Sequence, residues 1–277
     1  MASLLETVAN DLITQIKDDT LVLPSLPEVC LKVRDVAEDV NATIPQLATI
    51  ISQDAALAAR IVKVSNSPLV RTPSEVTDVG TAVARLGINF TSNLAMGLAM
   101  EQMFQATSDV IDKRMRQIWT QSSEIASICH VMAMHYTKLM PDQAMLGGLI
   151  HKIGALPILA YAEDNSALLN DAFTLDKLID KLHPYIGTHI VKAWRFPKDI
   201  QNIPSQYMKF DRTPEKSDYA DLVQVAVLQS VAETDHPYAQ LDWSTIGSFD
   251  RLGISPEVEM TEMVDLEEGE SITGLLS

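Results

Sequence analysis

The stretch GLIHKIGALPIL, residues 148–159, decides how the rest of the chain is interpreted. Its apolar residues surround one histidine, His151, and one lysine, Lys152, which is typical of a helix that enters a hydrophobic core. A histidine in such a place could bind a metal ion or a proton. Lys152 carries a positive charge where an acidic neighbour would suit a metal better. The stretch therefore marks either a catalytic centre or the remains of one.

The composition of the chain indicates a folded helical protein. Its 277 residues are enough to bury a full core, and they leave one or two domains open. Hydrophobic residues make up 47% of the chain and aromatic residues only 5%. Strands usually collect aromatic and β-branched residues, so this balance favours packed helices.

The charge, the apolar runs and the cysteines of the chain argue against nucleic-acid partners, membrane insertion and secretion. The net charge is −16 and the 21 Lys and Arg residues are scattered, so we expect no nucleic-acid partner. No apolar run reaches the length needed to span a bilayer, and the N-terminal stretch lacks the basic region of a secretory signal. Cys30 and Cys129 lie far apart in apolar periodic segments, as buried residues of a reducing compartment do. We expect a cytoplasmic protein that contacts no membrane.

The acidity of the chain is concentrated at its C-terminal end. A solvated helix with a frayed end explains this better than a docking motif. Residues 255–277 contain no basic residue and seven acidic ones: Glu257, Glu259, Glu262, Asp265, Glu267, Glu268 and Glu270.

Helical periodicity recurs along the whole chain. Two capping boxes, SLPE at 25–28 and TIPQ at 43–46, precede early apolar stripes. There is no hairpin chemistry and no Gly-rich βα loop, so the predicted fold class is all-α, a compact multi-helix array. Later helices are predicted over 79–87, 89–104, about 109–139, 174–182, 186–196, 217–234 and 242–251.

The longest predicted helix carries a seam for packing against another helix. A coiled-coil dimer would satisfy this pattern, but an intramolecular bundle is favoured because many partner helices are available. The stripe advances in steps of four and three residues through Ile111, Met115, Ile118, Ser122, Ile125, Cys129, Met132, Tyr136 and Leu139.

Sequence motifs for common chemistries are missing from the chain. There is no GxxxxGK[ST], GxGxxG, GxSxG or HExxH. A zinc or di-iron site needs several histidines and carboxylates that converge. Each histidine by itself is better explained as a capped, hydrogen-bonded or surface residue. The six are His130, His135, His151, His183, His189 and His236.

At residues 144–159, AMLGGLIHKIGALPIL, the chain resembles the His-Asp segment of the HD superfamily of metal-dependent phosphohydrolases. Three earlier stretches resemble the N-terminal half of the HDOD domain, a non-catalytic, signalling-associated branch of that superfamily. They are LPSLPEVCLKVRDV (23–36), IPQLATIISQDAALAARIVKVSNSP (44–68) and AVARLGINFTSNLAMGLAM (82–100). The resemblance implies an HD-like, HDOD array of helices.

The resemblance also divides the chain. Residues 1–19 are expected to form an N-terminal amphipathic helix, and residues 20–235 the HDOD domain. Residues 236–277 are expected to form a C-terminal helical extension with the acidic tail.

Carried over position by position, the resemblance implies a degenerate HD pocket. Gln121 stands where the superfamily places its first histidine, His151 matches the second, and Lys152 replaces the metal-binding aspartate. Gln229 stands near the position of the final aspartate. His183 resembles a histidine of the related GYP-bearing enzymes, whose double histidine would fall near 207–208 and is absent, as is the GYP signature.

These replacements disfavour a metal ion. Glutamine is a weak neutral ligand, and an ammonium group donates hydrogen bonds but accepts none. Two roles for Lys152 remain open. Its charge could replace the lost metal by pairing with a carboxylate in the pocket, or its stem could pack on the helix while the amine reaches water. The second is favoured, since long basic side chains usually find solvent. No metal, no cofactor and no catalysis are expected.

The resemblance implies a bacterial signalling role as a regulatory protein-interaction module. Its expected partners are a kinase, a response regulator or a cyclic-dinucleotide enzyme, each as a separate chain because no receiver or cyclase domain is attached. A homodimer is left open. The alternative is a metal-dependent phosphohydrolase that acts on a nucleotide or a cyclic dinucleotide.

Overall fold

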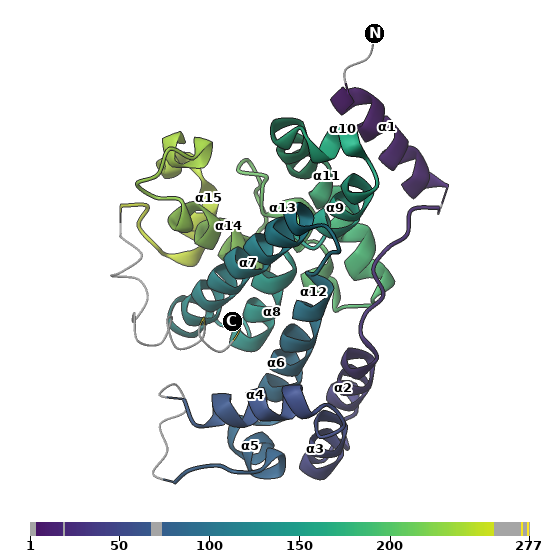
Figure 1. Cartoon of the computed structure of the whole chain (residues 1–277). Coiled ribbons are helices and arrows are strands. Elements are labelled where there is room, and N and C mark those ends of the chain that lie inside the picture. Colours follow the sequence, from purple (N-terminus) through teal and green to yellow (C-terminus); the bar gives the residue numbers. More distant parts are fainter. Residues whose placement is uncertain (1–3, 19, 68–73, 258–272, 274–275, 277) are drawn as a thin grey trace.

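The computed structural model describes residues 4–18, 20–67, 74–257, 273 and 276. Over these residues the chain forms helices and turns without any strand, so the all-α prediction is confirmed (Figure 1). The α-helices are α1 (Leu4–Lys17), α2 (Glu28–Glu38), α3 (Ile44–Ile51), α4 (Ala55–Ser65), α5 (Val79–Leu86), α6 (Ile88–Met100), α7 (Asp109–Tyr136), α8 (Pro141–Ile150), α9 (Ala155–Glu163), α10 (Ser166–Leu169), α11 (Ala172–Ala193), α12 (Lys198–Gln201), α13 (Ile203–Gln206), α14 (Tyr219–Ser230) and α15 (Gly247–Leu252). Short 3₁₀ helices are η2 (Glu101–Met103), η3 (Pro237–Gln240) and η4 (Trp243–Thr245).

The helices gather in two groups around a central pair. Figure 1 shows α2 to α5 at one end of the molecule, and α1 with α9 to α11 at the other. Helices α7 and α8 lie between them and pack against each other along their lengths. Helix α14 packs against both and carries α15 on its other side. Helices α6, α9 and α14 pack directly on this central pair.

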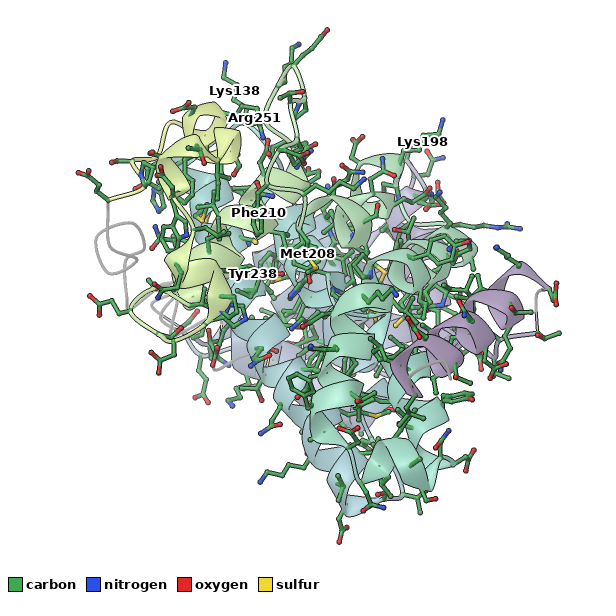
Figure 2. The ribbon with its side chains drawn as sticks, turned by 90° about the horizontal axis from the view of Figure 1, so that it is seen from above. Lys138, Lys198, Met208, Phe210, Tyr238 and Arg251 are labelled. Atoms are coloured by element: carbon green, nitrogen blue, oxygen red, sulfur yellow. The ribbon has the colours of Figure 1, made fainter. Side chains whose placement is uncertain are left out.

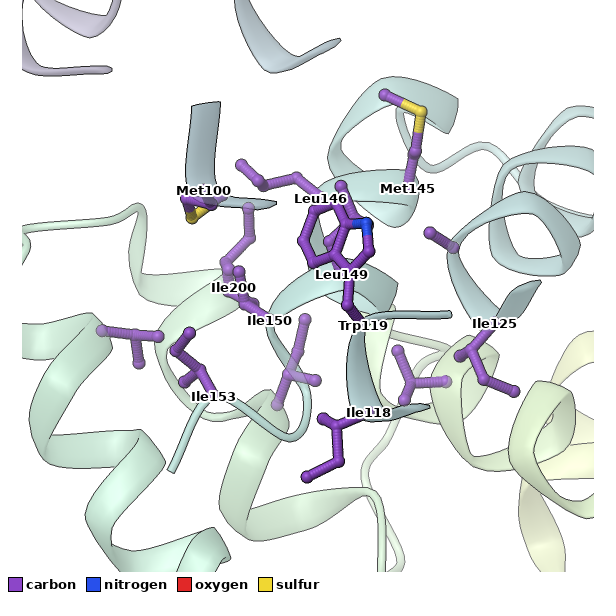
Figure 3. Close-up of a cluster of buried hydrophobic side chains, with 14 of the residues drawn as sticks. Met100, Ile118, Trp119, Ile125, Met145, Leu146, Leu149, Ile150, Ile153 and Ile200 are labelled. Carbon is purple, nitrogen blue, oxygen red and sulfur yellow. The ribbon is translucent and has the colours of Figure 1, made fainter. Parts of the chain in front are cut away.

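The seam predicted on α7 is buried inside the chain. Its positions from Ile111 to Met132 are all buried, and it becomes exposed only at Tyr136. Figure 3 shows α7 side chains, among them Ile118 and Trp119, clustered with Leu146 and Leu149 of α8. Burying such side chains is the main favourable term in folding. The preference for an intramolecular bundle is confirmed, and the seam is not accessible to a second copy.

Two glycines allow the backbones around the opening stretch to come unusually close. A Cβ atom on Gly148 would lie 2.5 Å from the Cα of Ala126 in α7. A Cβ atom on Gly154 would lie 2.1 Å from the carbonyl oxygen of His183 in α11. Real Cβ atoms do not approach backbone so closely, and only glycine fits. The first contact brings α8 against α7. The second brings the turn after α8 against α11 and so places Lys152 near His183.

Helix α11 corrects one prediction. The sequence predicts separate helices over 174–182 and 186–196, but the structure has one helix, Ala172–Ala193, with Pro184 inside it. Proline removes one backbone hydrogen bond and usually ends or kinks a helix. Here buried side chains continue on one face across the proline, from Leu178 through Ile186 to Ile190. Packing against the core keeps the helix continuous.

The two predicted capping boxes have different outcomes. At 43–46 the side-chain oxygen of Gln46 accepts the backbone N–H of Thr43 at 2.8 Å, as predicted. At 25–28 the prediction is wrong, because α2 begins at Glu28 behind Pro27 and no side chain caps it. Proline tends to start a helix by its fixed φ angle, without a side-chain cap.

The C-terminal end of the chain returns to the body. Leu276 is fully buried, and its carbonyl oxygen accepts hydrogen bonds from Trp119 Nε1 at 3.2 Å and Arg60 Nη2 at 3.3 Å. Thr273 Oγ1 lies 2.9 Å from Ser127 Oγ. The predicted frayed end is therefore wrong at Leu276. The predicted solvated acids from Glu259 to Glu270 lie outside the described residues.

One segment, Pro141–Glu163, has the length and mean hydropathy, 1.4, to cross a membrane, which the sequence prediction did not foresee. It corresponds to α8, a turn and α9, and 83% of its apolar window is buried inside the molecule. Core helices of globular proteins pass the same test. Among the residues that the structure describes, no other helix does so.

Candidate functional site: a cavity at the end of helix α8

A cavity of about 320 Å³ opens where α7, α8, α11 and α14 meet. Its floor consists of buried His151, His183 and Tyr207. Apolar side chains form its walls, among them Ile125 and Val227. Its exposed rim consists of Gln121, Glu124, Asp180, Ser230, His236 and Pro237.

Four of the five residues predicted for the degenerate pocket line this cavity. They are Gln121, His151, Lys152 and His183. Gln229 is buried on α14 and is not among the lining residues, whereas its neighbour Ser230 is. Successive side chains on a helix point about 100° apart. A shift of one position in matching the chain to the family therefore moves the matched residue off the site.

His151 is held as a neutral ring with one defined tautomer. Its Nδ1 lies 2.6 Å from the carbonyl oxygen of Gly148. A carbonyl oxygen only accepts, so Nδ1 carries the hydrogen and Nε2 keeps a lone pair. Burial, with a smaller contribution from the nearby charge of Lys152, lowers the pKa of His151 to about 3. At neutral pH the ring therefore offers an acceptor and no charge.

His183 has the same tautomer, but both of its nitrogens are engaged. Its Nδ1 donates to the carbonyl oxygen of Ile179 at 2.7 Å, and Nε2 accepts the hydroxyl of Tyr207 at 2.6 Å. Burial lowers the pKa of His183 to about 3. Burial also raises the pKa of the Tyr207 phenol well above its usual value, so the phenol keeps the proton that it donates.

Lys152 is half-buried on the side of the cavity. It makes no ion pair and no hydrogen bond with any residue that the structure describes. Burial lowers its pKa, while the carboxylates of Asp180 and Asp176 act in the opposite direction. The ion pair with a buried acid, one of the two roles considered, is not observed. Lys152 lines the cavity, and the favoured role, with the amine in water, stays a prediction.

Several lining residues were not predicted as site residues. Asp180 precedes His183 by three positions on α11, which places both on one helix face and could have been recognised. Tyr207 occupies the region where the double histidine of the GYP-bearing enzymes would fall. Nothing in the sequence pointed to Tyr238 in η3. Figure 2 shows Tyr238 gathered with Met208 and Phe210, and the rings of Phe210 and Tyr238 are 5.2 Å apart.

The donor set around this cavity does not fit the divalent metal that the HD superfamily implies. A metal site needs several anionic or neutral donors that converge on one point. Here Nε2 of His183 is occupied by Tyr207, and a lysine ammonium lies beside His151. Within the described part of the chain, no group of three His, Cys, Asp or Glu residues could hold a metal ion.

Solved structures resemble the chain over nearly its whole length. A protein of Shewanella amazonensis SB2B described as a "putative metal-dependent phosphohydrolase" is 27% identical, with a TM-score of 0.84 and 99% of each chain covered. An HDOD domain protein with unknown function from Geobacter sulfurreducens is 19% identical, with a TM-score of 0.66 over 98% of this chain and 95% of its own. The second likeness, at this identity, shows the fold alone.

Two further relatives are longer than this chain. A "putative signal transduction protein" of Marinobacter aquaeolei VT8 is 21% identical, with a TM-score of 0.67 over 98% of this chain and 66% of its own. An "uncharacterized protein" of Treponema pallidum (strain Nichols) is 22% identical over 263 residues, which are 88% of this chain. The chain spans about half of that relative, 49% of its length.

A model of the HDOD domain matches residues 23–208. This range includes α2 to α13 and the His151, Lys152 and His183 side of the cavity. It ends before α14 and η3, which supply the opposite wall. The chain belongs to the HDOD domain family.

Proposed function

We propose that this chain is a regulatory protein-interaction module of bacterial signal transduction and that it does not catalyse metal-dependent hydrolysis. Lys152 carries the proposal. Lys152 lines the cavity beside His151, where a carboxylate would be needed to hold a divalent ion. The ammonium of Lys152 and a divalent cation bound at His151 would repel each other, and the repulsion is strong where water is partly excluded. A metal-bound nucleophile therefore has no place in this cavity.

The proposed partners are signalling proteins on separate chains: a kinase, a response regulator or a cyclic-dinucleotide enzyme. Membership of the HDOD family supports this class, as does the fold shared with the Marinobacter protein described as a signal transduction protein. The net charge of −16 disfavours nucleic acid, and the burial of the apolar segment Pro141–Glu163 supports a cytoplasmic protein without a membrane partner. A homodimer, through a surface other than the α7 seam, belongs to the same proposal.

The phosphohydrolase alternative rests on the name of the Shewanella protein, which describes that protein. In this chain, Gln121 offers only a weak neutral ligand, the ammonium of Lys152 offers none, and Nε2 of His183 is already hydrogen-bonded to Tyr207.

Metal content tests the non-catalytic half of the proposal. The protein is purified after growth with added manganese and iron, and metal per chain is measured by plasma mass spectrometry. A metal site with intact ligands binds its ion strongly enough to keep it through purification. Because Gln121 and Lys152 replace two of the ligands here, we expect less than about a tenth of an equivalent. The control is His189→Ala, a histidine of α11 outside the cavity. One or two equivalents that His151→Ala abolishes and His189→Ala retains would contradict the proposal.

A pairwise interaction screen tests the signalling half. The chain is screened by two-hybrid assay against each kinase, response regulator and cyclic-dinucleotide enzyme of its own genome. We expect at least one partner, reproduced with purified proteins at micromolar affinity. A screen that yields no partner from these classes would contradict the assignment.

A further inference from the structure

We propose that the cavity at the end of α8 binds a small organic anion, whose single carboxylate or phosphate group contacts Lys152 Nζ. The inference goes beyond the proposed function, because protein interaction alone requires no ligand. It stands on the geometry of the cavity and on the charges that line it.

The first argument concerns charge. Lys152 is the only lysine or arginine among the described residues that line the cavity. The rings of His151 and His183 are neutral, so they add no second positive charge. Burial lowers the pKa of Lys152 although the carboxylates of Asp180 and Asp176 act in the opposite direction, so their attraction does not make up for the hydration that the ammonium has lost. An anionic oxygen would supply a charge-assisted hydrogen bond at that place.

The second argument concerns hydrogen bonding on the floor. Because Nδ1 of His151 donates to Gly148, its Nε2 is left as an acceptor. The Tyr207 oxygen donates to His183 and can still accept. A ligand that carries a hydroxyl group beside its acid group would match both kinds of site. Hydroxy acids and sugar-alcohol phosphates have this chemistry.

The third argument limits the size of the ligand. Ligand pockets range from roughly 300 to 1,000 Å³, and this cavity of about 320 Å³ lies at the small end. Its walls include Ile125, Val227 and Val231, which suit a short carbon skeleton. The cavity therefore fits a compact metabolite better than a cyclic dinucleotide.

The fourth argument limits the charge of the ligand. Glu124 and Asp180 lie on the exposed rim, so they repel any further negative charge that a ligand would leave at the mouth. One acid group can reach Lys152 inside, but a triphosphate would extend past both carboxylates. The ligand should carry its negative charge at one end only.

The binding test uses lactate, glycerol 3-phosphate and inorganic phosphate as probes, each titrated calorimetrically at neutral pH with a chelator present. Lactate and glycerol 3-phosphate distinguish a carboxylate from a phosphate group. We expect saturable binding of at least one organic probe, with an apparent dissociation constant between about 0.1 and 10 mM. ATP, the polyanion control, should bind at least about tenfold more weakly.

Three variants locate the site. Lys152→Met should weaken binding about tenfold or more, because it removes the charged partner and keeps the stem. Lys152→Arg, which keeps the charge, should retain binding within about threefold. The matched control is Lys181→Met, an exposed lysine of α11 outside the cavity, which should bind like the unchanged protein.

Val227→Phe separates occupancy of the cavity from charge. The larger ring should fill space at the wall and weaken binding while Lys152 remains. Circular dichroism and the unfolding midpoint show whether each variant is folded. If Val227→Phe does not fold, the Lys152 variants alone test the proposal. The proposal is overturned if no probe binds saturably, or if Lys152→Met binds as well as Lys181→Met. The chelator separates this result from that of the metal measurement.

Discussion

The two ends of helix α14 carry two buried polar clusters of opposite character. At its start, Asp221 is fully buried and accepts both Nε and Nη2 of Arg251, at 2.9 and 2.7 Å. It also accepts Arg212 Nη1 at 3.0 Å, and Arg212 pairs in addition with Asp218. At its end, Val227 and Ser230 face a cavity in which Lys152 has no such partner.

The first cluster closes on itself and the second is open. Arg251 grips Asp221 with two hydrogen bonds and Arg212 adds a third, so charges of both signs meet and offset each other. Such a network holds elements together, here α14 and α15. The cavity cluster keeps neutral rings, a lone ammonium and empty volume side by side. Buried charge that is neutralised indicates a structural role, while charge left beside a cavity indicates a binding site.

The largest effect should come from breaking the closed cluster. Asp221→Ala leaves Arg212 and Arg251 buried without their shared partner, which should destabilise the fold by about 3–5 kcal/mol. Urea unfolding followed by circular dichroism measures the loss. Asp211→Ala, an exposed acid nearby, is the control and should change stability by less than about 0.5 kcal/mol. Equal effects of the two variants would contradict a structural role for the cluster.

The backbone contact that supports the cavity comes next. Gly154→Ala would place a Cβ 2.1 Å from His183 O and 2.4 Å from Gly187 N, so α9 and α11 must move apart. We expect a loss of about 3 kcal/mol, the upper range for overpacking. Gly80→Ala on α5, where the new atom meets only Asp78 Oδ1 at 3.3 Å, should be neutral or slightly stabilising. A neutral Gly154→Ala would show that the cavity floor adapts.

The neutral histidines should make the open cluster sensitive to acid. The pKa values of His151 and His183 are about 3 in the folded protein, far below the unfolded value of about 6.5. The unfolded state therefore binds more protons between these values, and stability falls as pH falls below about 6.5. Each ring should contribute up to about 1.4 kcal/mol per pH unit.

Urea unfolding at a series of pH values between 5 and 7 measures this slope. His151→Gln should reduce it by about the share of one histidine. His189→Gln, which changes a histidine outside the cavity, should leave it unchanged. A slope that His151→Gln does not alter would mean that the ring is not held neutral.

The smallest effect should come from removing the unpaired charge. Lys152→Met deletes a half-buried ammonium that has no ion pair, so it should be neutral or stabilise the fold by up to about 1 kcal/mol. Lys152→Met should therefore change the free energy of unfolding in the opposite direction to Asp221→Ala. This contrast tests the difference between the two clusters most directly. Thermal unfolding of both variants at one pH measures it. Marked destabilisation by Lys152→Met would place Lys152 in the structural class.

Much of the fold could be predicted because its periodic patterns are local. The seam on α7 and the cap at Thr43 follow from residues a few positions apart. The continuity of α11 could not be predicted, because the packing that outweighs Pro184 comes from distant parts of the chain. The missing side-chain cap before Glu28 is a similar case, in which Pro27 starts the helix instead.

The site was predictable only at positions that carry the family resemblance. His151, Lys152 and His183 were found through the family resemblance, and the structure places all three on one cavity. Gln229 was misplaced, because position along a buried helix cannot be assigned to one face without its neighbours. Tyr238 and the rim around it come from a short 3₁₀ turn without any pattern.

The docking of Leu276 has a consequence for local unfolding at the C-terminal end of the chain. Its hydrogen bond to Arg60 joins residues that are 216 positions apart. Closing so long a loop costs entropy, and local contacts do not offset this cost. The bond should therefore form only after the helices between Arg60 and Leu276 have assembled. In native-state hydrogen exchange, the indole proton of Trp119 should therefore exchange at a lower opening free energy than the backbone amides in the middle of α7. That single proton reports how often the C-terminal end of the chain leaves the body.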